Sequence, residues 1–289
     1  MALELVTCDR PLGAEIKGLD TTVPLSSDDV AFVSDALLRH SVIFLRNNEL
    51  SDTGFRDFSA NFGTLRESNL KFALVSGLRE LNTLSNVIEN GRHIGNMDAG
   101  VYWHSDGAYT PKPTHFTILY GLEIPAKNGK SLGSTRFSST AAAYEALPDQ
   151  MKKRLEGMKV VNSMAHQVEK KRAAGVLKRG ELNEHQIRNG IETVHPLVRT
   201  HHLSGRKSLF LSEGHTIKIL DPDGASDEDL LAELQDHIVQ PQFIYAHDWQ
   251  VGDILMWDNI TTNHKASFDY DLPLRRVIRR STVQGPVPA

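Results

Sequence analysis

Residues 253–264 read DILMWDNITTNH, an apolar stretch that leads into a polar turn and ends on a histidine. Two other short runs flank it, FIY at 243–245 and the mixed run RRVIRR at 275–280. Runs of this length, separated by polar turns, are typical of buried strands and too short for ordinary helices. The C-terminal half of the chain is therefore predicted to consist mainly of short strands.

Helices are expected around these strands. The first is predicted to begin at Ser26 or Ser27 and the second at Ser51, where small polar residues can act as N-caps. A third is predicted after Ser226, with Asp229 in the capping-box position. The pattern favours a mostly β fold with flanking helices around a double-stranded β-helix, a jelly-roll or cupin-like core. Neither the dinucleotide-binding glycine motif nor the P-loop motif is present.

No repeat or linker divides the 289 residues, so we predict a single domain spanning residues 1–289. Residues 163–192 are rich in charged and amide side chains and poor in apolar ones. We expect them to form an exposed polar excursion whose charges face solvent, and which could fold over a site as a lid.

Charge and cysteine content exclude several classes of function. The net charge is −4, with 32 basic and 36 acidic side chains, so no global positive field favours nucleic acid. No apolar stretch approaches the ~18 residues that span a membrane, and no signal-peptide pattern is visible. The one cysteine, Cys8, excludes an internal disulfide and a cysteine-based zinc site. We therefore expect a cytoplasmic protein without nucleic-acid or membrane partners.

The strongest local motif is YWHSDG at 102–107. His104 and Asp106 are two residues apart, so on an extended chain they point to the same face and can reach one metal ion. One such pair is expected by chance among 13 histidines, and a surface turn capped by Asp106 is the alternative. His264, at the end of the 253–264 stretch, can supply the second imidazole of a non-heme Fe(II) facial triad.

The arginines of 275–280 alternate with apolar residues, as on a strand. Arg276 and Arg280 then share one face, and Arg275 and Arg279 the other. An arginine facing into a barrel needs a carboxylate, and a dicarboxylate that chelates a metal through its other end would supply one. Either pair can be the inward-facing one.

Together these segments resemble the taurine dioxygenase / dichlorophenoxyacetate dioxygenase family of Fe(II)- and 2-oxoglutarate-dependent oxygenases. The resemblance covers most of the chain and rests on GAEIKGLD at 13–20, FGTL at 62–65, WHSD at 103–106, WDN at 257–259 with His264, and the final arginine cluster. It implies a jelly-roll core, iron held by His104, Asp106 and His264, 2-oxoglutarate chelating that iron, and O₂ as the oxidant.

The resemblance also implies roles for other residues. The family's Gly-Asp-Thr turn is aligned with residues 129–131, so Ser131 takes the place of the threonine that helps bind 2-oxoglutarate. Arg276 matches the arginine that pairs with the far carboxylate of the co-substrate. Arg280 matches an arginine that meets the substrate's anionic group or the co-substrate. Dimers or tetramers are common in the family, so a homo-oligomer is expected.

Substrate contacts are predicted for Asn96, Tyr102 and His215, with a turn and core packing as the alternatives for Asn96 and Tyr102. His201 and His202 are adjacent and, on a strand, would point to opposite faces. They are therefore expected to be poor joint ligands with structural or exposed roles.

The predicted reaction is hydroxylation of a C–H bond of a small organic molecule, with succinate and CO₂ as co-products. An anionic substrate is favoured because the arginines near the site exceed what one dicarboxylate requires. Ile260, Gly100 and residues 66–70 depart from the taurine-hydrolysing members and argue against taurine itself. Hydroxylation beside a heteroatom would cleave the substrate. Biosynthetic hydroxylation, desaturation, or a non-catalytic metal-binding cupin-like protein are the alternatives.

Overall fold

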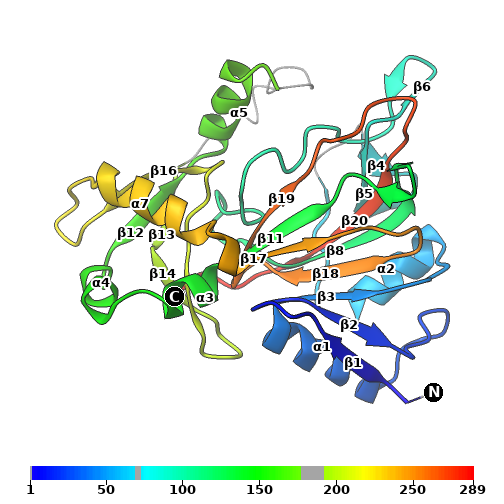
Figure 1. Cartoon of the computed structure of the whole chain (residues 1–289), viewed down its shortest axis with the longest axis horizontal. Helices are drawn as coiled ribbons and strands as arrows, with labels where there is room; N and C mark the ends of the chain where they lie inside the picture. The colour runs from blue at the N-terminus through cyan, green and yellow to red at the C-terminus, as the bar shows by residue number, and fades with distance from the viewer. Residues whose placement is uncertain (1, 69–72, 177–191) are drawn as a thin grey trace.

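The computed structural model describes residues 2–68, 73–176 and 192–289. Its centre is an eight-stranded sheet packed against a three-stranded sheet (Figure 1). The large sheet contains, in spatial order, β1 (Glu4–Thr7), β2 (Ala14–Lys17), β3 (Val42–Leu45), β18 (Ile254–Asp258), β8 (Thr114–Glu123), β20 (Val277–Gln284), β5 (Leu78–Ser85) and β4 (Leu74–Val75). Neighbouring strands are antiparallel except for the parallel pair β2 and β3.

The remaining strands of the described residues form smaller sheets. The sheet opposite the large one contains β17 (Ile244–His247), β11 (Thr135–Ser139) and β19 (Thr262–Ala266). A separate sheet contains β13 (Thr193–Pro196), β12 (Lys159–Asn162) and β16 (Thr216–Leu220). Three two-stranded pairs are β6 (Ile88–Glu89) with β7 (Arg92–His93), β9 (Ala126–Lys127) with β10 (Lys130–Ser131), and β14 (Val198–Thr200) with β15 (Lys207–Leu209).

Helices lie in two places (Figure 1). Helices α1 (Ser27–His40) and α2 (Asp52–Ala60) cover the outer face of the large sheet. The other helices within the described residues are α3 (Thr140–Glu145), α4 (Asp149–Arg154), α5 (Met164–Ala173), α7 (Glu228–Ile238) and the 3₁₀ turn η2 (Pro241–Phe243). Among the described residues, none of these helices has the length and apolar character that crossing a membrane requires.

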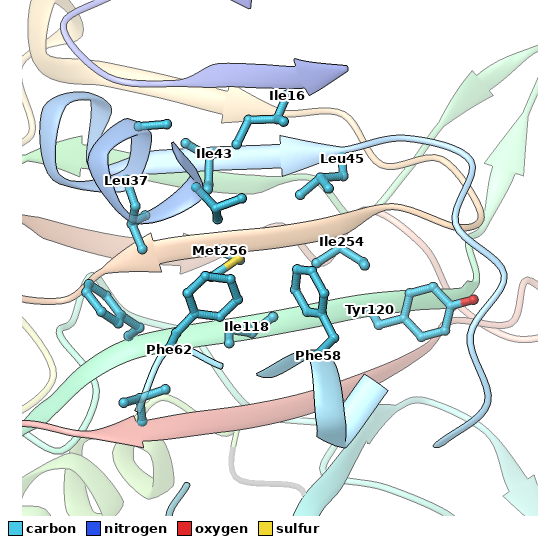
Figure 2. Close-up of a cluster of buried hydrophobic side chains, with 14 of the residues drawn as sticks. Ile16, Leu37, Ile43, Leu45, Phe58, Phe62, Ile118, Tyr120, Ile254 and Met256 are labelled. Carbon is cyan, nitrogen blue, oxygen red and sulfur yellow. The ribbon is translucent and has the colours of Figure 1, made fainter. Parts of the chain in front are cut away.

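Alternation along β18 gives the large sheet two buried faces. Ile254 and Met256 pack with the α1 and α2 side chains in the cluster drawn in Figure 2. Leu255 and Trp257 point the other way, into the cluster between the two sheets, where Phe137 of β11 also lies. A strand buried on both faces reads as a continuous apolar run, which explains the 253–257 sequence. The polar residues that follow Trp257 then connect β18 to β19 of the three-stranded sheet.

The N-caps of two helices are predicted correctly, and the predicted N-cap of the third is one residue too early. Ser26 and Ser51 cap α1 and α2. In α7 the cap is Asp227, whose carboxylate accepts the N–H of Leu230, and the predicted cap Ser226 lies one residue earlier. The physical reason is that Ser226 pairs with Leu220 in an isolated bridge and so stays outside the helix.

The expectation that residues 163–192 expose their charges holds for Glu169 and Arg172 but is wrong for Lys171. Residues 164–173 form α5, and Lys171 on it is only 2% exposed. Its ammonium lies 3.5 Å from the carboxylate of Asp98, which is also buried. A lysine paired in this way can be buried, which a count of charged residues does not reveal. Residues 177–191, on which most of the lid prediction falls, lie outside the described residues.

Candidate metal centre

Two backbone segments bring His104, Asp106 and His264 together. His104 and His264 form an isolated antiparallel bridge, with N···O distances of 3.0 and 2.8 Å. One ligand atom from each of the three residues lies within 4.8 Å of the others. Nε2 of His104 is 3.7 Å from Asp106 Oδ1, and Nε2 of His264 is 3.9 Å from Asp106 Oδ2. We call these three residues the metal-centre group.

The protonation states of this group suit a divalent metal. The Nδ1–H of His104 donates to the carbonyl of Tyr102 at 2.8 Å, which leaves the Nε2 lone pair available. Burial lowers the pKa of both histidines, so both rings are neutral. Burial raises the pKa of Asp106, but the guanidinium of Arg280 and the hydrogen bond from the Thr117 hydroxyl lower it well below its usual range. Two neutral imidazoles and a carboxylate are the donor set of non-heme Fe(II).

A cavity lies beside the metal-centre group, and side chains from the last arginine-rich segment, at β20, line part of its wall. Arg276 and Arg280 line it together with all three members of the group. Arg275 instead pairs with Glu123 at 2.7 Å, and Arg279 pairs with Asp52 at 2.6 Å, both outside the cavity. The alternation of the strand thus places Arg276 and Arg280 inward.

Arg276 is a buried cation without an anionic partner. Arg276 is only 6% exposed, and its Nε has no hydrogen-bond partner. Among the residues that the structure describes, no carboxylate lies within ion-pair distance of this guanidinium. The guanidinium carbon lies 6.0 and 5.9 Å from the ring centres of Trp249 and Tyr270. Because a buried guanidinium is costly when unpaired, this position favours binding of an anion from the cavity.

Thr135, and not the predicted Ser131, lies at this cavity. Ser131 belongs to the short β9–β10 pair and is outside the cavity lining, so its placement there was wrong. Thr135 lines the cavity, and its Oγ1 accepts the Nε1–H of Trp249 at 3.0 Å. Its own proton can then be donated to a ligand. Gly133-Ser134-Thr135 is a second Gly-x-Thr match four residues on, and it keeps the threonine itself.

The three predicted substrate residues are placed differently from one another. Asn96 lines the cavity, and its Oδ1 is buried without a hydrogen-bond partner. Tyr102 lies outside the lining, with its hydroxyl donating to the carbonyl of Lys170 at 3.2 Å. His215 also lies outside the lining, 6.1 Å from the ring of His104, and burial lowers its pKa to about 3.

A second cluster consists of His115, His201 and His202, and we call it the histidine cluster. Ligand atoms of these three residues also lie within 4.8 Å of one another. The rings of His201 and His202 are stacked 5.1 Å apart, so the prediction that they point to opposite faces was wrong. The reason is that β14 ends at Thr200, which puts both histidines in a turn where the alternation of a strand no longer applies.

Comparison with known proteins agrees with this geometry. Residues 5–282 match the model of the taurine catabolism dioxygenase TauD, TfdA family. The chain is 32% identical to the alpha-ketoglutarate-dependent 2,4-dichlorophenoxyacetate dioxygenase of Burkholderia sp. (strain RASC), covering 90% of this chain and 87% of that protein. It is 31% identical to pentalenolactone F synthase of Streptomyces arenae, covering 93% of this chain and 91% of that protein.

A solved structure is similar over the whole chain. The structure of AAD-2 in complex with Mn(II) and N-oxalylglycine is 28% identical, has a TM-score of 0.78, and is matched over 100% of this chain and 99% of that one. These matches confirm the predicted jelly-roll fold class, the oxidoreductase activity, and the requirement for Fe(II), 2-oxoglutarate and O₂. This chain therefore belongs to the taurine catabolism dioxygenase TauD, TfdA family, as a 2-oxoglutarate-dependent dioxygenase of small organic substrates.

Proposed function

We propose that the metal-centre group holds Fe(II) and that Arg276, assisted by Thr135, binds the far carboxylate of 2-oxoglutarate. The bound iron, with 2-oxoglutarate and O₂, supplies the oxidation of an unactivated C–H bond, and succinate and CO₂ are the co-products. The protein binds the co-substrate at two ends and holds the target carbon near the metal. The clustering of two imidazoles and a carboxylate at one end of the cavity supports the first part of this proposal.

The observation that carries the co-substrate assignment is the buried guanidinium of Arg276, which has no carboxylate within ion-pair distance among the described residues. A dicarboxylate bound at the metal through its keto-acid end would bring its other carboxylate into the same cavity. Guanidinium and carboxylate groups then pair in a bidentate arrangement, and the Thr135 hydroxyl adds one further donor. Arg276 would thus gain the anionic partner that it lacks within the described part of the chain.

The substrate that we propose is a small anion with an apolar body. Asn96 and Arg280 supply polar groups on the cavity wall, and Met97 and Phe268 supply apolar ones. Phe268 is 48% exposed, so it borders the opening of the cavity. Aryloxyalkanoates and sulfate esters combine an anionic group with an apolar body, and hydroxylation beside their heteroatom would cleave them. The similarity to a biosynthetic synthase supports biosynthetic hydroxylation or desaturation as the second candidate.

The test of the co-substrate assignment compares two adjacent arginines. With Fe(II) supplied, Arg276→Ala is expected to raise the 2-oxoglutarate concentration for half-maximal succinate release by about 30- to 5000-fold, because truncating one partner of a buried charge pair typically costs about 2–5 kcal/mol. Arg275→Ala is the matched control, since Arg275 points outward to Glu123. An unchanged half-saturation in Arg276→Ala would remove Arg276 from the co-substrate site.

Three broader predictions from the sequence also stay proposals. We propose a homo-oligomer, which size measurement in solution tests. We propose a cytoplasmic protein, supported by the single, unpaired Cys8. We propose a single domain, supported by the continuous sandwich that joins strands from the first residues to the last.

A further inference from the structure

A closed ring of hydrogen bonds surrounds the metal ligand Asp106. The backbone N–H of Asp106 donates to Asn259 Oδ1 at 3.1 Å. The side-chain N–H of Asn259 donates to Thr117 Oγ1 at 2.9 Å. The hydroxyl of Thr117 donates to Asp106 Oδ2 at 2.6 Å, which closes the ring. None of the predicted site residues other than Asp106 takes part in it.

The direction of each hydrogen bond in the ring is determined. Asn259 Oδ1 also accepts the Nε1–H of Trp257 at 3.1 Å, so the oxygen of the amide must face these two donors. Its nitrogen then faces Thr117 and the carbonyl of His115, which is 3.3 Å away. Because an amide nitrogen can only donate, Thr117 must accept from it. The single proton of the threonine hydroxyl is therefore left for Asp106.

The ring of hydrogen bonds is buried, so solvent does not compete for its donors and acceptors. Thr117 and Asn259 are both fully buried, and Asp106 is 8% exposed. Thr117 lies in the middle of β8, and Asn259 directly follows β18, where its backbone N–H donates to the carbonyl of His115 at 2.8 Å. Since β8 and β18 are paired over five residues of the large sheet, the distance between Thr117 and Asn259 is fixed by the sheet itself.

We propose that Thr117 is a positioning residue that holds the Asp106 carboxylate in the orientation facing both imidazoles, and thereby sets the metal affinity of the centre. This inference rests on the proposed role of Asp106 as an iron ligand. Thr117 occupies Oδ2, while Arg280 donates to Oδ1 at 2.8 Å. The two side-chain donors thus act on different oxygens. Without Thr117, Arg280 becomes the only side-chain hydrogen-bond donor to the carboxylate among the residues that the structure describes, and it draws the carboxylate away from the histidines.

The experiment measures metal binding without catalysis. Full-length metal-free protein is titrated with Co(II), whose visible absorption reports coordination, and the dissociation constants of the variants are compared. Removing a donor that orients a metal ligand typically lowers metal affinity by about 10- to 100-fold. We therefore expect Thr117→Val and Thr117→Ala to bind Co(II) about 10- to 100-fold more weakly than wild type. Thr117→Ser, which keeps the hydroxyl, is expected to restore binding to within about threefold.

The matched control is Thr140→Val. Thr140 is also fully buried, but its hydroxyl has no hydrogen-bond partner and it is not part of the ring. Wild-type affinity in Thr117→Val, or equal losses in Thr117→Val and Thr140→Val, would overturn the proposal. Failure of the underlying metal assignment looks different. In that case wild type would bind no Co(II), or His104→Ala would bind it as tightly as wild type does.

Discussion

The metal-centre group and the histidine cluster have similarly short distances between their potential ligand atoms, but they differ in the lone pairs that are available to a metal ion. Each places three potential ligand atoms within 4.8 Å. In the histidine cluster, Nδ1 of His201 accepts the N–H groups of Leu203 and Ser204, both at 3.1 Å. The ring proton of His201 is then on Nε2, which lies 3.0 Å from Asp258. His201 therefore has no free lone pair for a metal, whereas His104 does.

The comparison shows that proximity of histidines is not enough to define a metal site. A ligand group needs free lone pairs and, for a dication, a negative charge close to all of its members. The metal-centre group has both, through the free Nε2 of His104 and the ionised Asp106. In the histidine cluster, the nearby Asp258 is already engaged by Ile260, Thr261 and His201.

The largest effect is expected in the metal-centre group. His104→Ala removes one of three ligands, so Fe(II) affinity is expected to fall by at least about a hundredfold, with activity lost at ordinary iron concentrations. Iron binding is measured anaerobically by equilibrium dialysis. His93→Ala is the control, since His93 is exposed on β7 and is expected to have no effect. Undiminished iron binding in His104→Ala would contradict the assignment of His104 as an iron ligand and would remove the expected difference between the metal-centre group and the histidine cluster.

In the histidine cluster, the expected effect is on stability and not on iron. His201→Ala leaves the fully buried Asp258 carboxylate without its imidazole, which is expected to lower the free energy of unfolding by about 3 kcal/mol. Urea denaturation measures this change, and the iron stoichiometry of the folded variant should equal that of wild type. Loss of iron with unchanged stability would be the opposite of this prediction.

Acid should destabilise the protein partly through His115. Burial lowers the pKa of His115 to about 4, from about 6.5 in the unfolded chain. The unfolded state therefore binds more protons between these values, and stability is lost as pH falls from about 6.5 to 4. This contribution is at most about 3 kcal/mol. Unfolding free energies measured at pH 7 and pH 5 should differ less in His115→Gln than in wild type, and an identical pH dependence would argue against a buried neutral His115.

The smallest effect is expected at the exposed member of the histidine cluster. His202→Ala removes an exposed side chain that makes no hydrogen bond to a buried partner within the described part of the chain, so the free energy of unfolding should change by no more than about 0.5 kcal/mol. Its iron binding should also be unchanged. A loss of bound metal in this variant would show that the histidine cluster, too, holds a metal ion.

The features that the sequence predicted well depend on local periodicity. Residues two apart share a face of an extended chain, which predicted correctly that the side chains of His104 and Asp106 lie close together. The same rule divided the arginines of 275–280 into an inward and an outward pair, and only the choice between the pairs needed the structure. The assignment of His264 depended on a family resemblance, because no local rule connects residues so far apart in sequence.

The errors occur where register or burial is decided by distant contacts. Ser131 and Thr135 both follow a Gly-x pattern, and only the pairing of β11 with β19 shows which hydroxyl reaches the cavity. Lys171 was assigned to solvent because its partner, Asp98, is distant in the sequence. The hydrogen bonds of Thr117 and Asn259 around Asp106 were not predicted, because an isolated threonine on a buried strand carries no sequence signal. The WDN motif could have directed attention to Asn259.

The measurement that tests the central claim most directly is anaerobic. Fe(II) is added to metal-free protein, followed by 2-oxoglutarate, and the visible spectrum is examined for a metal-to-ligand charge-transfer band. We expect a band in wild type and in His202→Ala, and no band in His104→Ala. A wild-type protein that binds iron but shows no band with 2-oxoglutarate would contradict the proposed chelate.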